Sequence, residues 1–241
     1  MGQLGIVYQW AQEVGRGLRG IPKAQVLNLA AFSVGLGLSR RVTLAVVAEH
    51  LGCLGKADTV ERRFQRFLSS RKLSVRRVFA SWTAWVVRSL RPGGLVVLLV
   101  DETSLKDQLK VMAVALAYRG RAIPLAWQCY HQEHHPSGQV VLIGQLLREV
   151  AKGIPPGCQV VVEADRGIGT SPGFVRLVEG LGWYYLVRVT CQVHLRFQDG
   201  TVRTIGSIPV EQGQEWKASV QAFKKAGWLS AWAVVFWGAR G

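Results

Sequence analysis

Cysteine and long apolar runs are both scarce in the 241-residue sequence. The four cysteines, Cys53, Cys129, Cys158 and Cys191, stand singly. Disulfide and metal patterns need closer spacing, so we expect reduced, mostly buried thiols, as in a cytoplasmic protein. The apolar runs, such as Leu95–Val100 and a Trp-containing stretch at 228–237, are short. Neither approaches the ~20 residues needed to cross a bilayer, and no secretory signal pattern opens the chain, so we expect no membrane association.

Acidic residues are also few. The sequence has 15 Asp and Glu against 30 Lys and Arg, a formal net charge of +15. Through Gly94 the count is 15 basic against 4 acidic residues, or +11, and the remainder of the chain contributes +4. A basic excess concentrated in one segment favours a polyanionic partner such as nucleic acid. The alternative is a generally basic, solvated surface.

The region before residue 93 predicts an all-helical domain. Apolar spacing indicates helices over Ala24–Leu38, Thr43–Leu51 and Val75–Leu90. A Pro-Gly-Gly sequence at 92–94 interrupts the pattern sharply, and we place a domain boundary there.

Another helix is predicted to begin at Asp58. Asp58 with Glu61 three residues on is a capping-box pattern, in which each side chain bonds the other residue's backbone N–H. One face of this helix is apolar and carries Val60, Phe64, Phe67 and Leu68. The rest of its surface carries Arg62, Arg63 and Arg66, which we expect to contact DNA phosphates.

From residue 95 the pattern changes to strands alternating with helices. Strands are predicted at Leu95–Val100, Lys110–Tyr118, Ala122–Tyr130, Gln159–Ala164 and Trp183–Thr190. A tight turn at 119–121 joins the second and third strands, and helices are predicted at 137–152 and 172–181. This order predicts an α/β fold, a mixed sheet flanked by helices. Short strands at 193–197, 202–208 and 216–223 are expected to follow.

Two acidic residues follow predicted strands directly. Asp101 follows the first strand and Asp165 follows the fourth. Sites form where the carboxyl ends of neighbouring parallel strands line a crevice. Two carboxylates there repel one another unless a cation lies between them, and Mg²⁺ prefers oxygen ligands. The pair therefore indicates a metal site, although each Asp alone is also a common turn former.

Several further residues are weaker candidates. His131, His134 and His135 with Glu133 form a His-rich turn, but their spacing matches no established pattern of metal ligands. Glu163 shares a strand face with Asp165 and is either an accessory acid or a paired structural residue.

Glu102 is expected to face away from Asp101 if the first strand continues. Tryptophans near the carboxyl end are candidates for stacking on bases, with packing in a core or interface as the default. These are Trp216, Trp228, Trp232 and Trp237.

Three short sequences stand in a fixed order between about 95 and 200. They are Leu-Val-Asp-Glu-Thr at 99–103, Glu-Ala-Asp-Arg-Gly-Ile-Gly at 163–169 and, after a predicted helix, Trp-Tyr-Tyr-Leu-Val-Arg at 183–188. With these motifs the segment resembles the DDE transposases of bacterial insertion sequences. Upstream, residues 57–68 resemble the family's amino-terminal helix. The combination covers about 150 residues in the family's order.

The resemblance implies a ribonuclease-H-like catalytic core at 93–192, after a DNA-binding domain at 1–92 and before an incomplete β-rich insertion at 193–241. Asp101 and Asp165 match the first two catalytic acids and would bind Mg²⁺, or Mn²⁺. Arg166 would bind a DNA phosphate, brace Asp165 or pair with a local carboxylate. Gly167 and Gly169 would permit close approach to DNA or a tight turn.

The family's third acid is absent from these 241 residues. That Glu belongs to a Tyr-x2-Arg-x3-Glu-x6-Lys signature, and the only acids after residue 190 are Asp199, Glu211 and Glu215. We therefore interpret the sequence as a truncated transposase.

The implied activity is cutting and rejoining of DNA at transposon ends by two-metal-ion chemistry. The partner would be double-stranded DNA, both at the transposon ends and at the target. The protein would form a homodimer on DNA and would be located in the bacterial cytoplasm at the nucleoid. Because the third acid is missing, the alternative is a non-catalytic DNA-binding fragment that occupies ends or inhibits the full-length enzyme. A stand-alone nuclease of the same fold explains the two acids but not the basic helices.

Overall fold

A computed structural model describes residues 2–72, 74–90, 93–106, 108–133 and 137–237. The chain folds as two compact units, one formed by Met1–Arg91 with Arg148–Pro156 and the other by Pro92–Leu147 with Gly157–Gly241. The division after Arg91 lies beside the predicted boundary at 92. Residues 148–156, which the prediction placed in the catalytic core, belong to the helical unit. No helix among the described residues is both long and apolar enough to span a membrane.

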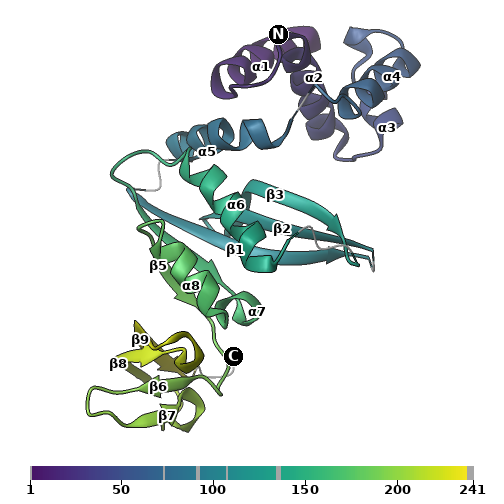
Figure 1. The fold of residues 1–241 in the computed structure, drawn as a ribbon. Helices are drawn as coiled ribbons and strands as arrows, with labels where there is room; N and C mark the ends of the chain where they lie inside the picture. Colours follow the sequence, from purple (N-terminus) through teal and green to yellow (C-terminus); the bar gives the residue numbers. More distant parts are fainter. Residues whose placement is uncertain (1, 73, 91–92, 107, 134–136, 238–241) are drawn as a thin grey trace. The chain divides into compact units, whose positions relative to one another are not determined.

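The helical unit contains five α-helices in its first segment (Figure 1). They are α1 (Gln3–Gly17), α2 (Lys23–Ser39), α3 (Leu44–Glu49), α4 (Ala57–Leu68) and α5 (Arg76–Leu90), with a short 3₁₀ turn at Gly52–Leu54. The sequence predicted helices near the last four, but gave no separate range for α1.

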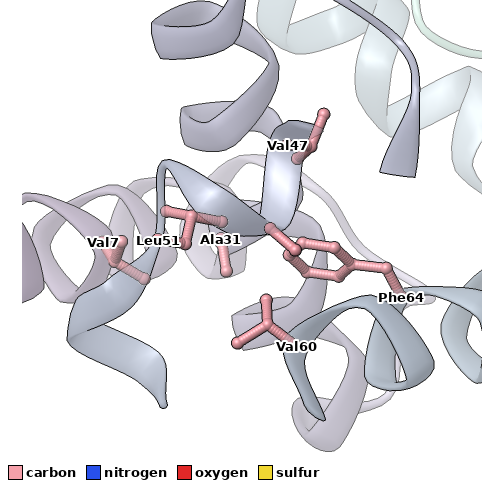
Figure 2. Close-up of a cluster of buried hydrophobic side chains, with 7 residues drawn as sticks. Val7, Ala31, Val47, Leu51, Val60 and Phe64 are labelled. Atoms are coloured by element: carbon pink, nitrogen blue, oxygen red, sulfur yellow. The ribbon is translucent and has the colours of Figure 1, made fainter. Parts of the chain in front are cut away.

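Helices α1 to α4 pack around a hydrophobic cluster drawn in Figure 2. Its largest member is Phe64 of α4, which is fully buried and meets the ring of Phe32 edge-on at 5.2 Å between centroids. Val7, Ala31, Val47, Leu51 and Val60 complete the labelled cluster. Helix α4 therefore buries Val60, Phe64 and Phe67 of its predicted apolar face, whereas Leu68 is 54% exposed. Its arginines lie on the remaining surface.

The predicted capping box at Asp58 is wrong. Helix α4 begins at Ala57, and its N-cap is Lys56, two residues before the predicted N-cap, with no side-chain cap hydrogen bond. Asp58 is consequently inside the first turn, where its charge stabilises the positive helix end instead of capping it.

The second unit contains a mixed five-stranded sheet with flanking helices. Its strands are β1 (Leu95–Leu105), β2 (Leu109–Tyr118), β3 (Arg121–His131), β4 (Gln159–Ala164) and β5 (Tyr184–Val187). Their spatial order is β3-β2-β1-β4-β5. Strand β1 is antiparallel to β2 and parallel to β4, and β4 is parallel to β5. The predicted turn between β2 and β3 is confirmed, since Arg119 and Gly120 both take positive φ values (47° and 73°) as a two-residue hairpin requires.

The two faces of this sheet differ in burial. On one face Val96, Leu98 and Val100 are at most 2% exposed. The connections through α6 (Gln139–Ala151) and α8 (Pro172–Glu179) cross the sheet in the same direction, so right-handed crossovers place both helices on one face. On the opposite face of edge strand β5, Tyr184 and Leu186 are 63% and 59% exposed.

A second, four-stranded antiparallel sheet follows, in the order β7-β6-β8-β9. Its strands are β6 (His194–Arg196), β7 (Val202–Thr204), β8 (Glu215–Ala222) and β9 (Leu229–Phe236). The predicted strand at 202–208 ends at Thr204 because a 3₁₀ turn occupies Ile205–Ser207, and β9 was not predicted as a strand.

The expectation of mostly buried cysteines is wrong. Cys129 and Cys191 are exposed, and Cys53 and Cys158 are half-buried. All four are free thiols, as predicted.

Candidate functional site

The two candidate aspartates lie side by side in the sheet unit. Val100 of β1 is the register partner of Ala164 of β4, and Asp101 and Asp165 are the next residues of these parallel strands. Adjacent strands are ~4.8 Å apart, so the two backbones bring both carboxyl groups to one edge. Strand β1 does not end at Val100 as predicted. It continues to Leu105 paired with β2 alone, so Asp101 lies where β1 loses its parallel neighbour.

Asp101 lies on the less buried face of the sheet. Its side chain is exposed, as is that of Asp165. The hydroxyl of Thr103 donates to Oδ2 of Asp101 at 3.2 Å. The other Asp101 carboxylate oxygen has no hydrogen-bond donor among the described residues and is available to a ligand.

Asp165 is the N-cap of α7 (Arg166–Gly169), a one-turn helix that the sequence did not predict. Its Oδ1 accepts from the backbone N–H of Ile168 at 3.1 Å. This bond holds the carboxylate at the carboxyl end of β4. The Asp-Arg-Gly sequence thus forms a strand-to-helix corner.

Gly169 fixes α7 against β5. A Cβ at this position would lie 2.7 Å from both the carbonyl oxygen of Arg188 and Cβ of Val187. Neither Gly167 nor Gly169 has a positive φ value. Gly169 is therefore required for close packing of helix on strand, where the sequence suggested a tight turn or an approach to DNA.

Glu163 lies two residues before Asp165 and is half-buried, beside Leu99 of β1 in the register. It shares the less buried face with Asp101 and Asp165, as predicted for Asp165. No group of three or more His, Cys, Asp or Glu side chains is close enough to hold one metal ion within the described ranges.

Glu102 points away from Asp101, as expected from a continuing strand, and belongs to a polar network that the sequence did not predict. Its Oε1 accepts from Lys110 Nζ at 2.7 Å, and its Oε2 accepts from the hydroxyl of Tyr130 at 2.5 Å. Burial alone would raise the pKa of Glu102, but hydrogen bonds from Lys110 and Tyr130 and the Lys110 charge outweigh it and lower the pKa. Burial and the carboxylate raise the pKa of Tyr130.

Asp101 and Asp165 fit a divalent ion but supply little of its coordination shell. Both are exposed, follow register-paired residues and are only partly hydrogen-bonded among the described residues, which suits hard cations with oxygen ligands. Mg²⁺ and Mn²⁺ need about six oxygen ligands, so water or substrate oxygens would complete the shell. Two carboxylates alone supply too few oxygen ligands for two such ions.

The His-rich turn offers no metal site in the described part. His131 accepts at Nδ1 from the backbone N–H of Glu133 at 3.3 Å. His134 and His135 lie outside the described residues.

The predicted DNA-binding arginines differ in their surroundings. Arg62 and Arg66 of α4 are exposed one turn apart. Arg63 is half-buried, and its Nε donates to Oδ1 of Asn28 on α2. Arg63 is thus engaged in holding two helices together. Arg166 is exposed, and no described carboxylate pairs with it.

The carboxyl-terminal tryptophans also divide into two groups. Trp216 packs on Phe197 with ring centroids 6.1 Å apart, and the Arg196 guanidinium lies 4.8 Å from the Trp228 ring centroid. These two have packing partners within the small sheet. Trp232 and Trp237 are 73% and 58% exposed.

No protein-family model matches the chain, and no curated protein matches it. The candidate site is therefore interpreted from its own geometry and from the sequence.

Proposed function

We propose that the chain is a DDE-type DNA transposase that binds transposon ends and cuts and rejoins phosphodiester bonds. The observation that carries the proposal is the parallel register of β1 and β4, which brings Asp101 beside Asp165. An antiparallel β1–β2–β3 meander followed by two parallel strands supports a ribonuclease-H-like reading of the sheet unit. The basic excess of the first 94 residues supports double-stranded DNA as the partner.

Asp101 and Asp165 would hold Mg²⁺ or Mn²⁺ at the strand edge. A bound ion of this kind polarises a phosphodiester and neutralises its developing charge. The aspartates fix the cleavage position on the sheet edge, and Asp165 is oriented for this by its bond from Ile168 N–H. Arg166, exposed beside Asp165, would hold a DNA phosphate. Rejoining by a DNA 3′-hydroxyl, and a homodimer on DNA at the nucleoid, rest on the family resemblance alone.

A non-catalytic role is the second candidate. Within the described ranges no third carboxylate joins the two aspartates, and the family's Glu signature is missing from the sequence. On this reading the chain occupies transposon ends, or inhibits a complete enzyme, and we expect no strand cleavage by the 241-residue chain.

Mn²⁺ binding to the purified chain, followed by electron paramagnetic resonance, tests the site. We expect Asp101→Asn and Asp165→Asn each to weaken binding at least about tenfold, because each removes one of two ligand charges. Asp199→Asn is the matched control, since Asp199 is also exposed and accepts from Thr201, in the turn between β6 and β7. Equal binding by all four proteins would contradict a metal site at Asp101 and Asp165.

A cleavage assay on end-containing duplex DNA separates the two candidate roles. Metal-dependent nicking that Asp101→Ala abolishes would establish the enzyme in this chain. Duplex binding without nicking, together with intact Mn²⁺ binding, would support the non-catalytic role.

A further inference from the structure

The helical unit contains a cavity of about 360 Å³ in which every charged lining residue is a cation. We call it the basic cavity. Its cations are Arg16, Arg19, Arg77, Arg88 and Lys152. Its remaining lining residues are small: Gly17, Ala80, Ser81 and Ala84. None of these belongs to α4, which carries the arginines that the sequence pointed to.

Close backbone contacts build the basic cavity from three segments of one unit. A Cβ at Gly17 would lie 2.5 Å from the Trp85 ring, so the end of α1 meets α5 closely. A Cβ at Gly153 would lie 2.2 Å from the carbonyl oxygen of Ala80, so the turn after α6 also packs on α5. The Ser81 hydroxyl donates to the carbonyl oxygen of Arg19 at 3.2 Å. The cavity is thus a product of the fold and not of chance side-chain positions.

The cavity keeps a positive excess after its ion pairs are counted. Arg16 pairs with Glu13 and Lys152 pairs with Glu149, both at 2.9 Å. Across the described chain, no carboxylate pairs with Arg19, Arg77 or Arg88. Three uncompensated guanidinium groups around small neutral side chains form a surface for phosphate oxygens, which guanidinium binds in a bidentate manner.

The spacing of these cations suits a polymer. Arg77, Ser81, Ala84 and Arg88 lie on one stripe of α5, at i, i+4, i+7 and i+11. Eleven residues of α-helix span about 16 Å, several times the ~3.4 Å rise per nucleotide of one DNA strand. Arg77 and Arg88 are thus far enough apart along α5 for each side chain to bind a different phosphate of one strand.

We propose that the basic cavity is a second DNA-binding site, which holds the sugar-phosphate backbone of a duplex through Arg19, Arg77 and Arg88. Phosphate recognition follows from the cavity itself. The choice of DNA as its source rests on the proposed function. The site contributes affinity without base specificity, because it presents only cations and small side chains.

The test measures the dependence of duplex affinity on salt by fluorescence anisotropy. Each lost phosphate contact reduces the log–log slope by about 0.9. We expect the triple variant Arg19→Ala, Arg77→Ala, Arg88→Ala to flatten the slope by two to three units, roughly three contacts at that value. The matched control removes three exposed cations of the other unit, Arg203, Lys224 and Lys225, and should leave the slope near that of the wild type.

A second variant, Ala84→Glu, adds a carboxylate to the cavity without removing a cation. It should weaken duplex binding at least about tenfold by repelling phosphates, with an unchanged circular dichroism spectrum. A wild-type slope in the triple variant, together with wild-type affinity in Ala84→Glu, overturns the proposal but leaves the metal site at Asp101 and Asp165 intact. Inorganic polyphosphate that binds in place of DNA, with the same loss in the variants, overturns DNA as the ligand and supports a polyphosphate instead.

Discussion

Asp165 combines a structural and a chemical task at one position. Its Oδ1 caps α7 by accepting from the Ile168 N–H. Its carboxylate is one of the two proposed metal ligands. Asn caps a helix about as well as Asp, whereas Ala does not. The two substitutions therefore separate the tasks.

We expect Asp165→Asn to retain stability and lose Mn²⁺ affinity. Asp165→Ala should lose the same affinity and also about 1 kcal/mol of unfolding free energy. Urea unfolding and Mn²⁺ titration of both variants check this. Equal destabilisation by Asn and Ala would show that the cap does not contribute.

The Glu102 network makes the stability of the sheet unit depend on pH. Its hydrogen bonds from Lys110 and Tyr130 lower the pKa of Glu102 in the folded state. A lowered folded pKa gives a stabilisation that is present above the unfolded value of ~4.3 and is lost as pH falls through the folded pKa.

Glu102→Gln should therefore lower the free energy of unfolding by about 1.5–3 kcal/mol at pH 7, by analogy with other hydrogen bonds to charged groups. The difference from the wild type should shrink below about pH 4. Urea midpoints at pH 7, 5 and 3 give the comparison. Glu215→Gln is the control, because Glu215 is exposed and its partner Lys217 is 3.8 Å away. If the stability difference between Glu102→Gln and the wild type grows as pH falls, folding raises the pKa of Glu102 instead of lowering it.

At the scale of single elements, α7 depends on the absence of a side chain at Gly169. Gly169→Ala would place a methyl group 2.7 Å from Arg188 O and Val187 Cβ. We expect a loss of about 1–3 kcal/mol, the usual cost of overpacking, and reduced Mn²⁺ affinity, since Asp165 caps the same helix. Gly173→Ala is the control in α8, where the nearest atoms are 3.6 Å away. The midpoints of thermal unfolding of Gly169→Ala and Gly173→Ala test the expected loss of stability.

The α4 arginines form the other proposed DNA surface of the helical unit. Arg62→Ala with Arg66→Ala should flatten the salt dependence of duplex binding by about two units, one per lost phosphate contact. Arg63→Ala should instead lower stability, because Arg63 donates to Asn28. Anisotropy titrations and urea unfolding of the two proteins separate the effects. A slope that changes only with Arg63→Ala would reverse this assignment.

Across the whole molecule, the sequence predicted elements best where burial imposes a period. Strand β4 matches its prediction at Gln159–Ala164 because its alternate residues are buried. Strand β1 was predicted too short because residues 101–105 are mostly polar and pair only with β2. Pairings such as Lys110 with Glu102 depend on the register of two strands, which no local pattern encodes. The basic cavity was not predicted for the same reason, since residues 16–19, 77–88 and 152 meet only in three dimensions.

The outer strand of the small sheet exposes apolar side chains. Trp232, Val234 and Phe236 alternate along β9 and are 73%, 53% and 63% exposed, and β9 is an edge of its sheet. Exposed apolar edge strands associate. We expect Val234→Lys to reduce concentration-dependent aggregation measured by light scattering. The control is Val202→Lys on β7, where the side chain is 44% exposed, and it should reduce aggregation less. Equal aggregation of Val234→Lys and the wild type would exclude β9 as the contact.

Gly153 has a consequence for any attempt to divide the protein. The turn that contains it belongs to the helical unit although it follows α6, so the polypeptide passes between the two units three times. No single proteolytic cut can release either unit whole. A fragment ending near residue 91 would lack the backbone that packs on Ala80 and Thr83, together with Lys152 of the basic cavity. Expression of the helical unit by itself therefore requires residues 148–156 to be grafted after α5 through a new linker.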